Sequence, residues 1–195
     1  MKKNLILTLL LCLYHPHAWS YPSDLLVSVG NLCEFIGVYQ TNESGDKNTC
    51  SFLPYFSSSL DIVLDKDWAV SPELSFTLPH SGRDKNVSIL NIATLINAKY
   101  KTQYLNLIFG TGFYFTRISG PGGEETLNNG NSTDSFPLPQ SAVYSRNFIL
   151  HLSLGHDFNT EWSTELYSYV FNSFTTMDRS LSAGAKVTYH FGDLL

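Results

Sequence analysis

The feature that most constrains this chain is an alternation of apolar and polar side chains with a period of two. Between Trp68 and Leu78, apolar side chains occupy the even positions and small or polar ones the odd positions. The segment from Leu181 to Phe191 repeats the pattern, and no sustained helical period follows residue 25. Such alternation is typical of strands whose two faces meet different surroundings. The chain is therefore predicted to be all-β.

Counting such segments gives about eight strands. They cover Leu25–Leu32, Phe52–Leu64, Trp68–Leu78, Val87–Tyr100, Tyr104–Ile118, Asn147–Phe158, Trp162–Asn172 and Leu181–Phe191. A tilted membrane strand needs about 9–11 residues, whereas strands of soluble proteins average about 5–6. Most of these segments are therefore long enough to cross a bilayer.

The connections alternate between short and long. They are tight at 65–67, 101–103 and 159–161, and longer around Ser44, His80, Gly122 and Asp178. Short turns at one end and long loops at the other are typical of an outer-membrane barrel whose termini lie on the periplasmic side. The predicted fold is an eight-stranded antiparallel up-and-down transmembrane β-barrel in the outer membrane of a Gram-negative bacterium.

The first residues have the pattern of a secretory signal peptide. Lys2 and Lys3 precede an apolar run from Leu5 to Leu13, and Ala18-Trp19-Ser20 supplies a cleavage site. We expect residues 1–20 to be removed and residues 21–195 to form one barrel domain.

With 15% charged residues and a formal net charge of −5, a nucleic-acid surface is not expected.

Aromatic side chains gather next to the short turns, where a membrane barrel carries an interfacial girdle. The predicted girdle comprises Trp68, Tyr100, Tyr104, Trp162, Tyr189 and Phe191. The alternative is that aromatics are common in strands of every kind. The chain would then be a soluble secreted sandwich with its apolar faces turned inward.

The final strand reads Ser182-x-Gly184-x-x-Val187-x-Tyr189-x-Phe191. It resembles the terminal assembly signal of outer-membrane barrels, although four further residues follow the phenylalanine here. Trp68…Glu73-Leu74-Ser75 and Trp162…Glu165-Leu166-Tyr167, each after a short turn, resemble hairpins of the OmpA-like and opacity-type barrels. The resemblance implies the barrel fold and contact with the barrel-assembly machinery.

An eight-stranded barrel has a lumen just wide enough to be filled by side chains. Charged residues fall on the predicted polar faces, and buried charges persist only when they are paired. We therefore expect a lumenal charge network that plugs the barrel, made of Asp61, Glu73, Lys99, His151, Glu165, Lys186 and His190. A small-solute channel is the alternative. No spacing typical of a metal site occurs, and no cofactor is expected.

A second alternative is an enzyme. His151, Ser153 and Glu165 are the residue types of a base, a nucleophile and an orienting acid. Their spacing is similar to that of the outer-membrane lipid A deacylases, which implies a lipid A-modifying hydrolase. In that family the acid follows a surface loop, whereas here a periplasmic-side turn separates it from the serine.

Cys33 and Cys50 are an even pair in an oxidising compartment, and we expect a disulfide between them. A first strand that ran straight on to Gln40 would hold the two cysteines too far apart. The bridge requires their Cα atoms within about 7 Å. It therefore predicts a strand that ends near Cys33, a pinched loop from Glu34 to Thr49, and a register that pairs Cys33 with Cys50.

The segment from Ser119 to Arg146 is the most distinctive loop. Its Gly, Asn and Pro content favours mobility, and a recognition or shielding role at the cell surface is the alternative. The predicted function is an integral outer-membrane barrel with a structural or surface-interaction role through its loops. Expected partners are outer-membrane lipid, lipopolysaccharide and a surface ligand of the Ser119–Arg146 loop, without nucleic acid.

Overall fold

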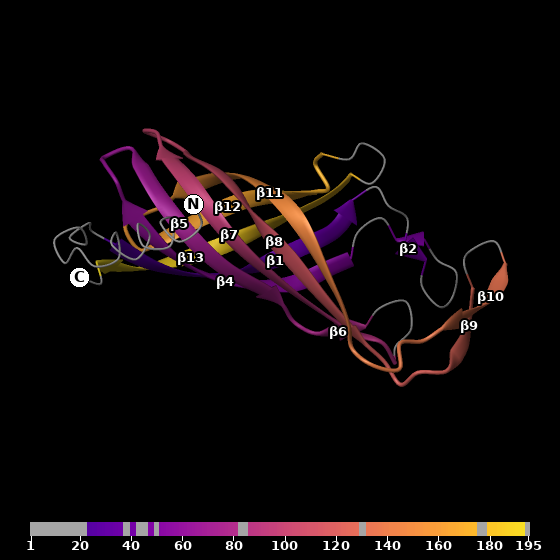
Figure 1. The fold of residues 1–195 in the computed structure, drawn as a ribbon. Coiled ribbons are helices and arrows are strands. Elements are labelled where there is room, and N and C mark those ends of the chain that lie inside the picture. Colours follow the sequence, from indigo (N-terminus) through magenta and orange to yellow (C-terminus); the bar gives the residue numbers. More distant parts are fainter. Residues whose placement is uncertain are drawn as a thin grey trace, which may run out of the picture.

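The structure is a computed structural model that describes residues 23–36, 40–41, 47–48, 51–81, 86–128, 132–174 and 179–193. In this part of the chain, eight long strands close into an antiparallel barrel (Figure 1). The barrel strands are β1 (Ser23–Ile36), β4 (Ser51–Val63), β5 (Trp68–Thr77), β7 (Ser88–Lys101), β8 (Asn106–Ser119), β11 (Val143–Asp157), β12 (Trp162–Phe171) and β13 (Ser180–Asp193). Each strand pairs with its neighbours along the chain, and β13 returns to β1. The predicted fold class is confirmed.

The short turns owe their shape to side chains that cap the backbone. Asp65 Oδ1 accepts hydrogen bonds from the amides of Asp67 and Trp68 at 2.8 and 2.9 Å. Asn159 Oδ1 does the same for Glu161 and Trp162, at 2.8 Å each. Asp and Asn favour such turns because the side chain replaces a backbone acceptor. Two hairpins of the barrel are thus closed by the same local chemistry.

The apolar face of each strand points outward. On β5, Ser71 and Glu73 are 0% and 6% exposed, whereas Leu74, on the opposite face of the strand, is 54% exposed. Exposed Phe109 and Leu166 continue the apolar surface on β8 and β12. A soluble sandwich would place its apolar faces inward. Polar side chains inside and apolar ones outside are instead the arrangement of a transmembrane barrel.

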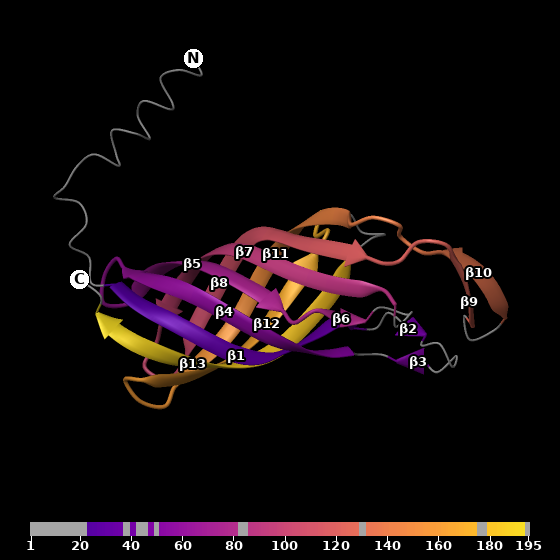
Figure 2. The same cartoon turned by 90° about the horizontal axis from the view of Figure 1, so that it is seen from below.

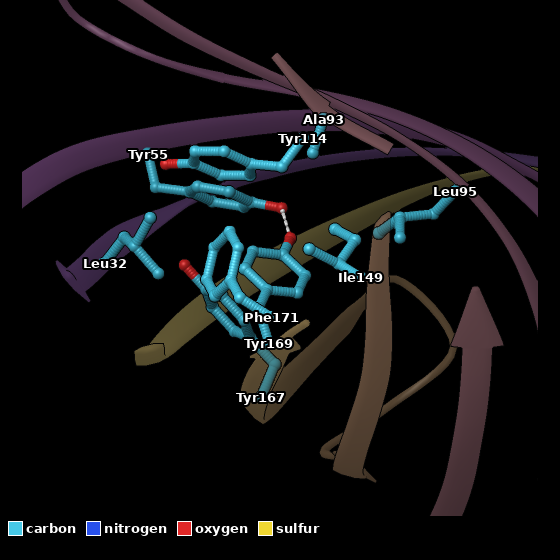
Figure 3. Close-up of a cluster of buried hydrophobic side chains, with 9 residues drawn as sticks. All are labelled: Leu32, Tyr55, Ala93, Leu95, Tyr114, Ile149, Tyr167, Tyr169 and Phe171. Carbon is cyan, nitrogen blue, oxygen red and sulfur yellow. Dashed lines mark hydrogen bonds between the residues drawn. The ribbon is translucent and has the colours of Figure 1, made fainter. Parts of the chain in front are cut away.

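Aromatic rings fill the lumen toward its long-loop half. Tyr55, Tyr114, Tyr167, Tyr169 and Phe171 are all nearly inaccessible and converge from three strands, β4, β8 and β12 (Figure 3). A glycine makes room for one of them. A Cβ at position 184 would meet the Tyr167 ring at 2.5 Å, so only glycine fits beside that ring.

The long-loop end carries small additional pairings. They are β2 (Gln40–Thr41) with β3 (Lys47–Asn48), β6 (His80–Ser81) with β7, and β9 (Glu124–Asn128) with β10 (Thr133–Pro137). The β9–β10 hairpin projects beyond the barrel wall (Figure 2). The Ser119–Arg146 loop thus contains a paired hairpin, which was not predicted from the sequence, while its mobility stays a prediction. Gly122 and Gly123, where the chain enters the hairpin, adopt φ of 77° and 88°, left-handed angles that suit glycine.

The predicted register of the first hairpin is wrong by two residues. β1 continues to Ile36, Cys33 lies opposite Phe52, and Asp24 lies opposite Asp61. A slip of two keeps every side chain on its predicted face, because the side-chain period is two. Cys50 lies outside the described residues, so the predicted disulfide stays a prediction.

The predicted signal peptide, residues 1–20, also lies outside the described residues. Within the described part of the chain, no helix is long and apolar enough to cross a membrane.

Candidate functional site

The centre of the lumen holds a buried ion cluster. Lys186 on β13 places its Nζ 2.9 Å from Glu73 Oε1 on β5 and 3.3 Å from Glu165 Oε1 on β12. All three residues are at most 7% exposed. Glu165 is the paired neighbour of Lys186 on the adjacent strand, whereas Glu73 reaches it across the lumen. The cluster therefore joins opposite parts of the barrel wall.

Uncharged polar residues extend the cluster. Asn97 Nδ2 donates to Glu73 Oε2 at 3.0 Å, and Asn97 Oδ1 lies 2.8 Å from His151 Nδ1. Because the Asn97 oxygen can only accept, the His151 proton lies on Nδ1. Tyr55 donates its hydroxyl hydrogen to Glu73 Oε1 at 3.2 Å. Glu73 thus accepts hydrogen bonds from three side chains on three different strands.

The Tyr55 hydroxyl also lies 2.5 Å from the hydroxyl of Tyr169, as the dashed line in Figure 3 marks. The two rings come from β4 and β12, on different sides of the lumen. Sequence reasoning missed Asn97, Tyr55 and Tyr169, since an uncharged residue on a polar face carries no signal of its partner across a barrel.

A second set of ion pairs lies near the short-turn end. Lys99 Nζ lies 2.7 Å from Asp61 Oδ1, and His190 Nδ1 lies 2.7 Å from Asp24 Oδ2. A cavity of about 210 Å³ opens here. Asp24 was not predicted as a member, although it falls on the inward face of β1. Of the predicted network, Asp61 and Lys99 pair with each other, while His190 pairs with Asp24, which was not predicted.

A third polar cluster surrounds Glu34 near the long-loop end. Asn91 Nδ2 donates to Glu34 Oε1 at 2.6 Å, and the Tyr114 hydroxyl donates to the same oxygen at 2.5 Å. His80 Nε2 lies 3.9 Å from Glu34 Oε2. The prediction ended the first strand at Leu32 and so left out Glu34. Polar layers thus lie above and below the aromatic layer of the lumen.

The geometry required of a hydrolase is incomplete. His151 Nε2 lies 3.7 Å from Glu165 Oε1, so the predicted base and acid do meet. In a serine triad the acid accepts from Nδ1 and the serine contacts Nε2. Here Asn97 takes Nδ1, and the buried Ser153 Oγ has no hydrogen-bond partner in the part of the chain that the structure describes. Nothing in the described residues activates Ser153 as a nucleophile.

The predicted girdle residues gather at the short-turn end. Trp68 packs on Tyr100 with ring centroids 4.8 Å apart, and Trp162 packs on Tyr189 at 5.0 Å. Tyr104 is 72% exposed on the same rim. Amphipathic rings at this level are suited to a membrane interface.

Among the described residues, no group of three or more His, Cys, Asp or Glu side chains is arranged to hold a metal ion.

Comparison with known proteins places the fold. No family model and no curated protein matches the sequence. In the solved structures, Ail, the attachment invasion locus protein of Yersinia pestis, is 11% identical, with 88% of this chain and 99% of Ail aligned at a TM-score of 0.51. Ail in a phospholipid bilayer nanodisc gives 9% identity, coverage of 87% and 99%, and a TM-score of 0.50.

The N-terminal β-barrel domain of Pseudomonas aeruginosa OprF is also similar, at 12% identity, coverage of 85% and 97%, and a TM-score of 0.49. The likeness to Ail shows that the chain has the fold of a small outer-membrane β-barrel. Its apolar outer face fits insertion in the bacterial outer membrane.

Proposed function

We propose that this chain is an outer-membrane barrel with a lumen closed by its own side chains, and that its long loops serve a structural or surface-interaction role. The observation that carries the closed lumen is the contact of Lys186 with Glu73 and Glu165 across the barrel. The hydroxyl pair of Tyr55 and Tyr169 adds a second bridge beside it. Eight strands leave a lumen that side chains fill, which supports the proposal.

Solute flux through reconstituted vesicles tests the closed lumen. Vesicles that contain the barrel should swell in arabinose no faster than empty vesicles. The double variant Tyr55→Ala, Tyr169→Ala removes one lumenal bridge and should speed swelling. The matched control Leu154→Ala changes a lipid-facing residue and should leave the rate unchanged. Rapid swelling with the unaltered barrel would favour the small-solute channel instead.

The projecting β9–β10 hairpin supports the surface role. Glu124 and Asp134 are exposed on it, beyond the barrel wall. Loops on a rigid scaffold are common binding elements, and Ail, which shares the fold, is an attachment protein by name. An epitope tag inserted at positions 129–131 should be detected by antibody on intact cells. Detection only after the outer membrane is broken would contradict the proposed surface position.

The remaining proposals concern the route to this state. A signal peptide of residues 1–20 would deliver the chain to the barrel-assembly machinery, and a Cys33–Cys50 disulfide would tie the first long loop. Mass spectrometry of the purified protein tests both. It should give the mass of residues 21–195 less two hydrogens, and alkylating reagent should add mass only after reduction.

A further inference from the structure

Two charged side chains lie on the lipid-facing wall of the barrel. Among the described side chains that follow the outward alternation of the eight strands, Arg117 on β8 and Arg146 on β11 are the only Lys, Arg, Asp or Glu. Both are exposed. Every other charged side chain described on these strands follows the inward alternation. The two arginines therefore interrupt an otherwise uncharged wall.

The two arginines are neighbours. In the pairing of β8 with β11, Arg117 lies opposite Tyr144 and Arg146 lies opposite Phe115. Arg117 and Arg146 are thus diagonal neighbours on one face, a spacing of about 7–8 Å. The Arg146 guanidinium lies 5.3 Å from the centre of the Phe113 ring. The Tyr144 side chain, 72% exposed, adds a hydroxyl beside Arg117.

Among the described residues, no acidic side chain pairs with either arginine. The salt bridges of the described residues involve neither arginine. Charges on a lipid-facing surface are costly unless an opposite charge or the interface compensates them. The planar guanidinium binds a phosphate through two parallel hydrogen bonds, which the lysine ammonium does not do.

The height of the pair indicates what compensates it. Arg117 follows the first outward residue of its strand, Leu107, by ten positions on the same face. A strand rise of about 3.4 Å per residue and a tilt of about 40° place it about 26 Å above Leu107. The apolar band of outer-membrane barrels is about 25 Å tall. Arg117 therefore lies where the outer leaflet passes from acyl chains to headgroups, and Arg146, opposite Phe115, lies two residues or about 5 Å lower.

We propose that Arg117, Arg146 and the Tyr144 hydroxyl form a binding site for a phosphate of lipid A, the glycolipid of the outer leaflet. The inference rests on the proposed outer-membrane function and names its lipid contact. The site is on the long-loop side, which in an outer-membrane barrel faces the cell exterior and so the glycolipid leaflet. One guanidinium packs on Phe113, which leaves its N–H edge free for the phosphate.

Retention of lipid A tests the proposal. The affinity-tagged barrel is placed in phosphatidylcholine nanodiscs with either bisphosphorylated lipid A or the same lipid A freed of phosphate. Lipid retained after purification in detergent is measured by mass spectrometry. The unaltered barrel should retain the bisphosphorylated form at least about tenfold better, as expected for charge-assisted bidentate contacts.

Three variants isolate the site. Arg117→Gln with Arg146→Gln should abolish the preference, and Arg117→Lys with Arg146→Lys should keep only part of it, because charge remains without bidentate geometry. Arg179→Gln is the matched control. Arg179 is also an exposed arginine at the long-loop end, but its Nη2 donates to the Ser173 carbonyl at 2.8 Å. Its variant should behave like the unaltered barrel.

Three results would overturn the proposed lipid A site. An unchanged preference in the double glutamine variant, or an equal loss in Arg179→Gln, would remove the site. Equal retention of phosphatidylglycerol would replace lipid A by any anionic lipid and so contradict the proposal. Gel migration before and after boiling separates the two claims. If the barrel folds but shows no preference for phosphorylated lipid A, only the lipid A site is contradicted. If the chain forms no barrel, the proposed function is contradicted.

Discussion

Replacing Lys186 by methionine should destabilise the folded barrel by about 3–5 kcal/mol, the cost of removing one partner from a buried ion pair. Methionine fills the volume of the lysine stem but leaves Glu73 and Glu165 without their shared cation. The Nζ atom lies 2.9 and 3.3 Å from these two carboxylates, and its side chain is 4% exposed. Water therefore has little access to replace the lost charge.

Urea unfolding in phospholipid vesicles measures this loss. A chain produced from residue 21 onward has Trp68 and Trp162 as its tryptophans, both near the short-turn rim, so their fluorescence reports departure from the bilayer. Lys101→Met is the matched control. Lys101 pairs with Asp157 at 2.8 Å but its side chain is 64% exposed. Solvent screens such a pair, and its loss should cost at most about 1 kcal/mol.

A triple variant tests the reasoning behind the number. Adding Glu73→Gln and Glu165→Gln to Lys186→Met removes the orphaned charges, and neutral replacement of a whole buried ion cluster is often close to neutral. The triple variant should therefore be more stable than Lys186→Met alone. Two results would refute the argument that uncompensated charge determines the loss. Lys186→Met would be as stable as the unaltered barrel, or the triple variant would be less stable than Lys186→Met.

Three further changes have expected outcomes. Tyr55→Phe removes the hydroxyl that donates to Glu73 and should cost about 1–3 kcal/mol in the same urea assay, because buried acceptors lose a partner. Gly184→Val places a side chain where the Tyr167 ring lies, and the fraction of folded barrel on an unboiled gel should fall sharply. Ser153→Ala should leave the stability of the barrel unchanged, and neither this variant nor the unaltered barrel should release acyl chains from added lipid A. Acyl release by the unaltered barrel that is lost in Ser153→Ala would support the hydrolase alternative.

The strands could be predicted from the sequence because the membrane imposes a strong pattern. Lipid outside and polar packing inside make the alternation nearly continuous in β5 and β13, and their predicted bounds lie within two residues of the observed ones. The register of β1 with β4 could not be predicted in the same way. A slip of two residues leaves the alternation unchanged, so only the turn between the strands distinguishes the two registers.

The lumen was predictable in part. Charged residues such as Glu73 and Lys186 stand out on a polar face, and the need to pair buried charges names them as members of a network. Which carboxylate meets which cation depends on the shear of the closed barrel, a property of all eight strands together. Asn97 and Tyr55 carry no charge, so only the three-dimensional arrangement reveals that they hold Glu73.

The β9–β10 hairpin was missed for a different reason. Glycine, asparagine and proline mark turns, and a segment rich in them resembles a mobile loop. The same residues also form the tight bends of a short hairpin, as Gly122 and Gly123 do at its base. Composition alone does not separate the two cases.

Heat modifiability is the direct test of whether this protein is a transmembrane barrel with an apolar exterior. The mature chain is extracted in detergent and compared on an SDS gel with and without boiling. The protein should require detergent for solubility, and boiling should shift its migration, because a closed hydrogen-bonded barrel resists SDS until heated. A chain that dissolves in water without detergent and migrates identically in both lanes would contradict a transmembrane barrel.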